Sequence, residues 1–277
     1  MTATLAEIIE HKRREVSEVM ADRPLAEVRA EGSGTPAPRD FFGAVTGRSG
    51  PGPVAIIAEI KRRSPSAGQI RPEYAGEGFA PERIARLYAE HGASAISCLT
   101  DEKFFDGRSA FIGRVKAACP LPVLRKDFLI DPRQVWESRT LGADAVLLIA
   151  ECLPGDELAR MAEEAAEAGL ACLIEIHDEA NLERAAGLLE GAGAAGRLLG
   201  INNRDLRTMR TDLGHTLRLC GRVADGSRLV SESGIRTRGD LDRLASAGVG
   251  AALVGESLMR QADPGMALRK LLDPKGP

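Results

Sequence analysis

The chain of 277 residues lacks the features that mark a membrane, secreted or nucleic-acid-binding protein. No run approaches the roughly 18 apolar residues of a membrane-spanning helix, and the charged first twenty residues do not form a signal peptide. The five cysteines are scattered without a Cys-x-x-Cys pair, which indicates reduced thiols. A net charge of -3 gives no electrostatic case for nucleic acid. We therefore expect a cytoplasmic protein that acts on a small molecule, and we favour a monomer.

Metal-binding and dinucleotide-binding motifs are missing as well. The histidines are far apart and lack ligand spacing: His11, His91, His177 and His215. The first apolar run is followed by Lys-Arg-Arg-Ser, whereas a dinucleotide-binding fold would place a Gly-x-Gly-x-x-Gly turn there. We expect no metal site.

The beginning of the chain predicts a helical extension. Thr4 and Glu7 have the spacing of a capping box. A stripe at helical intervals follows, made of Leu5, Ile8, Ile9, Lys12, Val16 and Val19. Residues 43–53 are rich in glycine, serine and proline, which is typical of a connection. We therefore divide the chain into an extension at residues 1–53 and a main domain at residues 54–277.

One pattern repeats through the main domain: a short apolar run, a polar loop, a helical stretch and a glycine. The apolar runs lie at residues 54–60, 95–99, 122–126, 145–150, 171–176, 198–202, 229–231 and 251–254. Asp131 followed by Pro132 predicts a helix start, and Gly142 predicts its end. Similar junctions of glycine and small residues lead into strands at 92–95, 142–145 and 248–251. One supersecondary unit is being reused.

Eight continuous apolar strands, each followed by a helix, favour a parallel sheet that is covered on both faces. Closure of such a sheet at eight strands gives an α/β barrel. A doubly wound open sheet is the alternative, but it usually has fewer strands and a glycine-rich turn after the first. The predicted fold is a (β/α)8 TIM barrel with an N-terminal helical extension.

Polar residues follow six of the predicted strands, at the barrel end where active sites lie. These clusters contain Glu59, Lys61 and Ser64; residues 125–128; Glu175; residues 202–205; residues 231–234; and residues 255–257. The last two offer backbone N–H groups from Gly234, Gly255 and Glu256, an arrangement that binds phosphate. Tight turns explain each glycine separately, but the clusters together predict a phosphorylated substrate.

The remaining candidates for chemistry are two lysines, two carboxylates and an amide: Lys61, Lys126, Glu59, Glu175 and Asn202. We expect partial desolvation to lower the pKa of a site lysine, which suits it to donate a proton near neutral pH. We also expect desolvation to raise the pKa of Glu175 into the range of a general acid or base. A structural ion pair is the alternative explanation for the charges that end the first strand.

His177 follows Glu175 closely but has a simpler explanation. Ile176 and His177 end the strand, and Asp178 is expected to cap the next helix. We therefore leave His177 out of the predicted site.

Several motifs, in one order along the chain, resemble those of the indole-3-glycerol-phosphate synthase family. They are AEIKRRSPS at 58–66, LTD at 99–101, RKDF at 125–128, LIE at 173–175, GINNRDL at 200–206 and SESGI at 231–235. The helical extension resembles that family too. Several motifs in register are a more specific signal than any single one.

The resemblance implies a carbon-carbon lyase of tryptophan biosynthesis that acts on 1-(2-carboxyphenylamino)-1-deoxyribulose 5-phosphate. Ring closure, loss of carbon dioxide and loss of water would give indole-3-glycerol phosphate without cofactor or metal. Lys126 is implied as the acid at the ketone oxygen. Lys61, paired with Glu59, is implied as the cation for the aromatic carboxylate.

The same resemblance implies roles for the other candidates. Glu175 would be the second proton-transfer group in the dehydration, and Asn202 would orient the anthranilate moiety. Arg204 would hold the network together by pairing with a site carboxylate. Phe128 and Glu232 are expected to contact the substrate. The phosphate-binding positions are expected to be Ser64, Ser233, Gly234, Gly255 and Glu256. The loop at residues 67–79 is longer and richer in glycine than the family pattern, and we expect it to cover the site.

Three other functions remain open at this point. Phosphoribosylanthranilate isomerase is a similar barrel, but it would have a cysteine base where this chain has Glu59 and Lys61. A Schiff-base aldolase also needs a lysine at a strand end. A barrel without activity would serve as a binding module, because a fold alone does not fix function. The set of charges at the strand ends argues against the inactive module.

Overall fold

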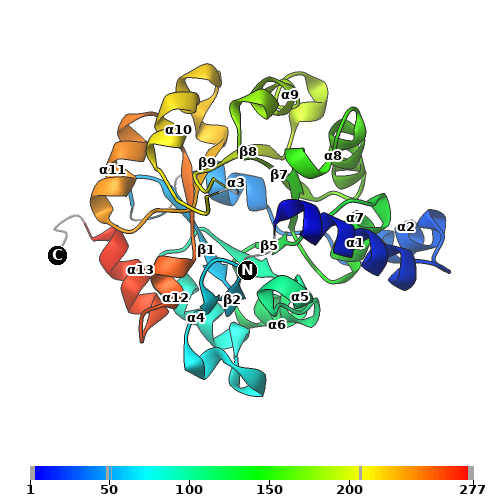
Figure 1. Cartoon of the computed structure of the whole chain (residues 1–277), viewed down its shortest axis with the longest axis horizontal. Coiled ribbons are helices and arrows are strands. Elements are labelled where there is room, and N and C mark those ends of the chain that lie inside the picture. Colours follow the sequence, from blue (N-terminus) through cyan, green and yellow to red (C-terminus); the bar gives the residue numbers. More distant parts are fainter. Residues whose placement is uncertain (1–3, 48–49, 51, 206–207, 274–277) are drawn as a thin grey trace.

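A closed barrel of eight parallel strands forms the centre of the molecule (Figure 1). The computed structural model describes residues 4–47, 50, 52–205 and 208–273, so Leu206 of the sequence motif lies outside the description. The barrel strands are β1 (Ala55–Ile60), β4 (Ala95–Leu99), β5 (Val123–Lys126), β6 (Ala145–Ile149), β7 (Ala171–Ile176), β8 (Arg197–Asn202), β9 (Leu229–Glu232) and β10 (Ala251–Val254). Neighbours in the barrel are neighbours in the sequence, and β10 closes against β1. The predicted TIM barrel is confirmed.

The strand boundaries lie close to the predicted runs. Strands β4, β7 and β10 coincide with the runs at 95–99, 171–176 and 251–254. Every residue of these three strands is buried, because the barrel interior covers one face and the helices cover the other. This double burial is why the runs are continuous rather than alternating.

Helices surround the barrel and follow its strands. They are α4 (Pro81–Glu90), α5 (Glu102–Phe105), α6 (Ala110–Ala118), α7 (Pro132–Thr140), α8 (Glu157–Glu167), α9 (Leu182–Gly187), α10 (Gly214–Leu219), α11 (Arg238–Ser246), α12 (Glu256–Met259) and α13 (Pro264–Leu272). Asp131 caps α7 with Pro132 in its first turn, as predicted. Within the described ranges, no helix combines the length and apolar character needed to cross a bilayer.

Several short elements were not predicted. A small antiparallel hairpin, β2 (Arg63–Ser64) with β3 (Gly68–Gln69), follows β1. Short 3-10 helices lie in the connections: η1 (Pro72–Tyr74), η2 (Gly76–Gly78), η3 (Ala150–Cys152), η4 (Glu179–Asn181), η5 (Ala192–Ala194), η6 (Cys220–Arg222) and η7 (Gly226–Arg228). These elements have only two or three residues each, too few for a periodic pattern in the sequence.

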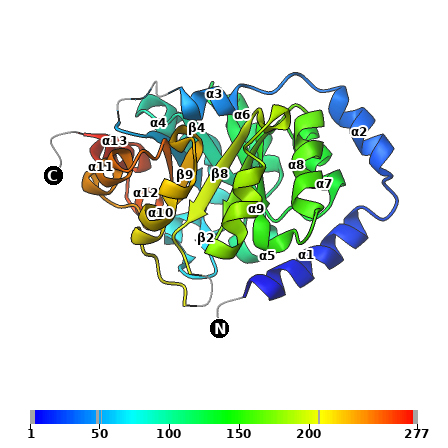
Figure 2. The ribbon, with the colours of Figure 1, turned by 90° about the horizontal axis from the view of Figure 1, so that it is seen from above.

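The first part of the chain forms three helices that wrap around one side of the barrel (Figure 2). They are α1 (Leu5–Val19), α2 (Leu25–Ser33) and α3 (Phe41–Thr46). Thr4 and Glu7 make the predicted capping box of α1. Figure 2 shows α1 at the barrel end where β2 lies and α3 at the opposite end. The helix α1 therefore sits at the end where the strands finish.

A buried lysine fixes α1 in this position. Lys12 is only 1% exposed, and its Nζ lies 3.2 Å from Oδ2 of Asp101 and 3.1 Å from Oδ1 of Asp127. Asp101 follows β4 and Asp127 follows β5. Burial lowers the pKa of Lys12, but Asp127 and Asp101 outweigh this effect and raise it. Burial likewise raises the pKa of Asp127, while Arg125 and Lys12 bring it down to about 2.

Replacing Lys12 by methionine should destabilise the protein strongly. The change removes the cation of Asp101 and leaves Asp127 with Arg125 alone, and breaking a buried pair in this way costs about 3 to 5 kcal/mol. Urea unfolding measures the loss. Arg14→Ala is the control, because Arg14 lies on the exposed face of α1 and forms a long ion pair with Glu10. A Lys12→Met protein as stable as the Arg14→Ala protein would contradict the buried-pair analysis.

Acid should weaken the same cluster. Because the folded state lowers the pKa of Asp127 to about 2, its contribution is complete above the ordinary pKa of about 4 and disappears as the pH falls towards 2. We expect Asp127 to account for a loss of about 2 kcal/mol over this interval. Urea unfolding of the wild type and of Asp127→Asn at several pH values isolates this term. Parallel pH dependences for the two proteins would show that Asp127 does not contribute.

Candidate active site

A cavity of about 690 Å³ opens at the carboxyl ends of the strands. Every residue that the sequence predicted for the site lines it: Glu59, Lys61, Ser64, Lys126, Phe128, Glu175, Asn202, Arg204, Glu232, Ser233, Gly234, Gly255 and Glu256. They come from segments spread over most of the chain. The barrel therefore brings the predicted candidates into one pocket.

Four charged side chains form the floor of this pocket. Glu59, Lys126, Glu175 and Glu232 come from β1, β5, β7 and β9, which are alternate strands around the barrel. Alternate strands contribute the side chains of one interior layer, and such layers are usually apolar. Here the layer nearest the opening holds three carboxylates and one lysine.

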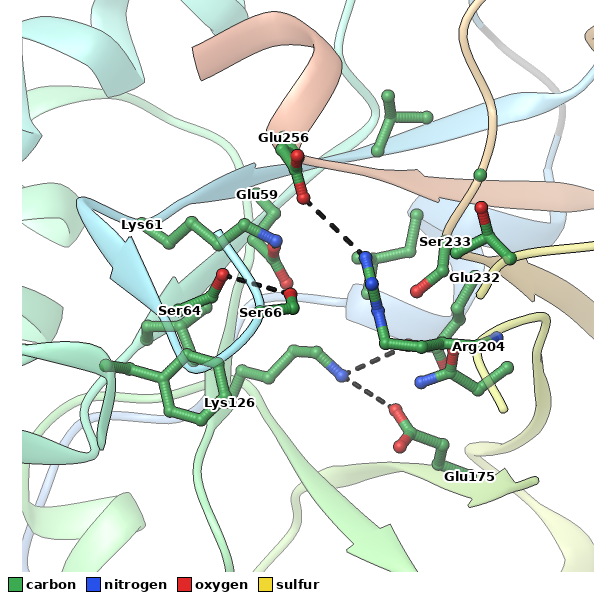
Figure 3. Close-up of a pocket in the computed structure, with 18 of the residues that line it drawn as sticks. Glu59, Lys61, Ser64, Ser66, Lys126, Glu175, Arg204, Glu232, Ser233 and Glu256 are labelled. Atoms are coloured by element: carbon green, nitrogen blue, oxygen red, sulfur yellow. Dashed lines mark hydrogen bonds and ion pairs between the residues drawn. The ribbon is translucent and has the colours of Figure 1, made fainter. Parts of the chain in front are cut away.

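Lys126 is the centre of this group (Figure 3). Its Nζ lies 2.7 Å from Oε2 of Glu175 and 3.1 Å from Oε2 of Glu232. The lysine side chain is 14% exposed, whereas both carboxylates are almost completely buried. One ammonium group is therefore shared by two carboxylates that would otherwise repel each other.

The shared lysine sets the charge states, and it reverses two expectations from the sequence. Burial lowers the pKa of Lys126, but Glu175, Glu232 and Glu59 outweigh it and raise the pKa. Burial raises the pKa of Glu175, but Lys126 and His177 lower it to about 2. The predicted directions for a site lysine and for Glu175 are both wrong, because ion pairing outweighs desolvation. Burial and repulsion by Glu175 instead raise the pKa of Glu232 well above its ordinary value.

Glu59 and Lys61 form the predicted pair at the end of β1, with Nζ 2.6 Å from Oε1. Two glycines leave room for the carboxylates of the floor. A Cβ atom at Gly255 would collide with Glu59, and one at Gly200 would collide with Glu232. Gly255 therefore has a packing role in addition to its predicted place at the phosphate.

The predicted phosphate end is built from irregular backbone. Ser233 and Gly234 follow β9 with φ values of 67° and 80°. The left-handed conformation is uncommon for serine, and such residues concentrate at functional sites. Asn203, which the sequence analysis did not select, donates from Nδ2 to the carbonyl of Ser233 at 3.1 Å and to Oγ of Ser231 at 3.0 Å. Asn203 is buried and does not line the pocket, so it supports the turn at Ser233 from behind, a contact that no local pattern in the sequence indicates.

Arg204 crosses the opening of the pocket towards Glu256 (Figure 3). The nearest atoms, Nη2 of Arg204 and Oε2 of Glu256, are 3.6 Å apart, so Arg204 forms an ion pair with a carboxylate that lines the pocket. The Arg204 N–H also donates to Oδ1 of Asn202 at 3.1 Å. The Arg204 pair therefore connects the segment after β8 to α12.

One side of the pocket is apolar. Leu5 and Ile8 of α1 line it together with Leu147, Phe105 and Phe128. The rings of the two phenylalanines have centroids 6.1 Å apart. No described side chain of residues 67–79, the loop expected to cover the site, lines this cavity, whereas α1 contributes Leu5 and Ile8.

His177 also lines the pocket, although the sequence analysis left it out. The predicted cap is present, since Oδ1 of Asp178 accepts from the Asn181 N–H at 3.0 Å. His177 nevertheless lies two residues after Glu175, and strand residues two apart share a face. Its Nε2 is 3.2 Å from Oε1 of Glu175. The alternation of side chains along a strand therefore predicts that His177 lies beside Glu175 in the site.

Among the described residues, no group of three or more His, Cys, Asp or Glu side chains is arranged to hold a metal ion. The chemistry that this chain itself offers is proton transfer between lysine, carboxyl and imidazole groups.

Comparison with known proteins gives a consistent result along the whole chain. The family model described as indole-3-glycerol phosphate synthase matches residues 5–271. The indole-3-glycerol phosphate synthase of Acidithiobacillus ferrooxidans is 49% identical, covering 98% of this chain and 99% of the relative. That of an Azoarcus species is 47% identical, covering 98% and 99%.

Solved structures agree on the fold alone. The 3-hexulose-6-phosphate synthase of Salmonella typhimurium superposes with a TM-score of 0.58 at 17% identity, over 79% of this chain and 96% of that one. The sequence relatives have much higher identity to this chain, and their similarity covers both the N-terminal extension and the barrel. The chain belongs to the indole-3-glycerol phosphate synthase family, the carboxy-lyases that form the indole ring in tryptophan biosynthesis.

Proposed function

We propose that Lys126 is the general acid with which this chain converts 1-(2-carboxyphenylamino)-1-deoxyribulose 5-phosphate into indole-3-glycerol phosphate. The observation that carries the proposal is its central position between Glu175 and Glu232 on the floor of the pocket. Because the two carboxylates raise its pKa, Lys126 holds its proton at neutral pH when the substrate arrives. An acid that is already charged and fixed needs no reorganisation before the reaction.

The first step is ring closure. The aromatic carbon that bears the carboxylate attacks the ketone carbon, and the ketone oxygen takes the proton of Lys126. The aromatic carboxylate then leaves as carbon dioxide, and its bonding electrons restore the aromatic ring. We assign Lys61 to this carboxylate as its counter-charge, with Glu59 fixing the ammonium at 2.6 Å.

The second step removes water. The hydroxyl formed from the ketone takes a proton from the protonated carboxyl group of Glu232 and leaves as water, and the neighbouring ring carbon loses a proton. We assign the removal of that proton to Glu175, since Lys126 and His177 keep it a carboxylate. Glu232 has a raised pKa, so its protonated carboxyl group is suited to donate a hydrogen bond to the substrate.

The remaining residues are assigned to binding. Asn202 orients the anthranilate ring against Phe128 and the apolar wall, and Arg204 fixes this arrangement through Glu256. The phosphate is assigned to Ser64, Ser233, Gly234, Gly255 and the backbone of Glu256, all of which line the pocket.

We also propose a cytoplasmic monomer, with residues 1–53 as an extension and residues 54–277 as the catalytic barrel. All five cysteines are free and buried, which supports a reducing compartment. Light scattering after size exclusion tests the monomer, because it measures the mass in solution.

Replacing Lys126 by alanine should abolish most of the turnover. A positioned general acid contributes about 10² to 10⁴-fold, so we expect kcat to fall by about 10³-fold. The growth of the indole absorbance with EDTA present and no added cofactor measures the rate. Lys103→Ala is the control, because Lys103 is exposed on α5. Turnover equal to that of the control in a folded Lys126→Ala protein would remove Lys126 from this role; trapping with borohydride would then test a Schiff base.

Replacing Gly234 by alanine should weaken phosphate binding. The residue has φ +80°, and a new Cβ would lie 3.1 Å from Cβ of Thr211, so the backbone must shift. Losing one hydrogen bond to a charged group corresponds to about tenfold in affinity, and we expect KM to rise by about that factor while kcat changes less. Gly239→Ala is a matched control, because Gly239 lies in α11 with no close contact. An unchanged KM for Gly234→Ala would exclude this turn from the phosphate site.

A further inference from the structure

The charged network does not end at Glu175. Lys126 contacts Oε2 of Glu175, and the other oxygen, Oε1, lies 3.2 Å from Nε2 of His177. Each oxygen of this carboxylate therefore faces a different nitrogen. His177 is 8% exposed and belongs to the pocket lining. Because each of its oxygens contacts a nitrogen, the carboxylate of Glu175 is fixed in one orientation.

The far side of the histidine ring is held as well. Its Nδ1 lies 3.2 Å from Oε2 of Glu151, and Oε1 of Glu151 accepts the backbone N–H of His177 at 2.7 Å. Glu151 comes from η3 and does not line the pocket. Asn181 fixes Glu151 in turn, with Nδ2 3.3 Å from Oε1. The imidazole is clamped between two carboxylates, and only one of these, Glu175, borders the substrate cavity.

The surroundings favour the charged imidazolium. Glu151 on η3 and Glu175 on β7 attract it, and Lys126 on β5 repels it. His215 on α10 is the other titratable neighbour, and burial and Arg218 lower the pKa of that group, so it is neutral. Burial lowers the pKa of His177, but Glu175 and Glu151 outweigh this and raise it.

The need for a second cation follows from the order of the reaction. Lys126 gives up its proton during ring closure and becomes a neutral amine. Glu175 would then be a buried carboxylate without a cation, and desolvation would favour its protonation before the dehydration. His177 supplies a positive charge that does not depend on the state of Lys126.

We propose that His177, held by Glu151, is a positioning residue that fixes Glu175 and keeps it ionised between the two proton-transfer steps. The inference rests on the proposed role of Glu175 as the proton acceptor of the dehydration. It assigns to Glu151, which lies outside the pocket, an effect on turnover that acts through the imidazole.

Glu151→Gln is the main test, because it removes the anchor without touching the pocket. We expect kcat to fall about tenfold, as for other partners that orient a reacting group, with KM changed less than twofold. His177→Asn should lower kcat further. In single-turnover experiments, carbon dioxide release should stay fast in both variants while the indole signal appears late. Glu179→Gln, which changes an exposed carboxylate on η4, is the matched control and should behave as wild type.

Nuclear magnetic resonance of the imidazole separates positioning from general damage. We expect the pKa of His177 to be lower in Glu151→Gln than in the wild type. Wild-type kcat in both Glu151→Gln and His177→Asn would overturn the inference, and so would an unchanged His177 titration in Glu151→Gln. The variant Glu175→Gln distinguishes a failure of this inference from a failure of the proposed role of Glu175. If it loses activity while the other variants keep theirs, only the inference fails; if it keeps activity, the proposed role of Glu175 fails.

Discussion

The arrangement of the site depends on one ammonium group shared by two buried carboxylates. Without Lys126, Glu175 and Glu232 would face each other in a medium that screens charge poorly. With it, the pKa of Glu175 is lowered to about 2 while the pKa of Glu232 is raised, so the two carboxyl groups differ in acidity. The pKa values of two chemically identical side chains are thus shifted in opposite directions by their surroundings. Gly255 and Gly200 lie against Glu59 and Glu232, and because they have no side chain they leave the space that these carboxylates occupy.

Much of this structure could be predicted from the sequence because its signals are local. Continuous apolar runs predict strands that are buried on both faces, and β4, β7 and β10 were located to the residue. The rule that barrel sites lie at the carboxyl ends of strands then placed all the predicted site residues in one cavity. These predictions depend on local sequence patterns and do not require knowledge of which side chains contact each other.

The features that were missed depend on such contacts. The pKa directions of Lys126 and Glu175 were predicted from desolvation, whereas their separation of 2.7 Å makes ion pairing the larger effect. Lys12 fitted the helical stripe of the extension, but its partners Asp101 and Asp127 are distant in the sequence. His177 was explained by the cap that follows it, although strand periodicity also places it beside Glu175. Local patterns specify elements, and the contacts between elements specify the charge states.

The buried contact of Lys12 links α1 to the barrel and has a consequence for the order of events during synthesis. A ribosome releases α1 long before Asp127 exists, so the contacts of Lys12 cannot be complete until β5 has been made. The barrel in turn closes only when β10 pairs with β1. Leu5 and Ile8 are among the first residues translated, yet the cavity that they line includes residues as late as Gln261. In the nascent chain, the substrate cavity is therefore complete only when segments from both ends of the sequence are present.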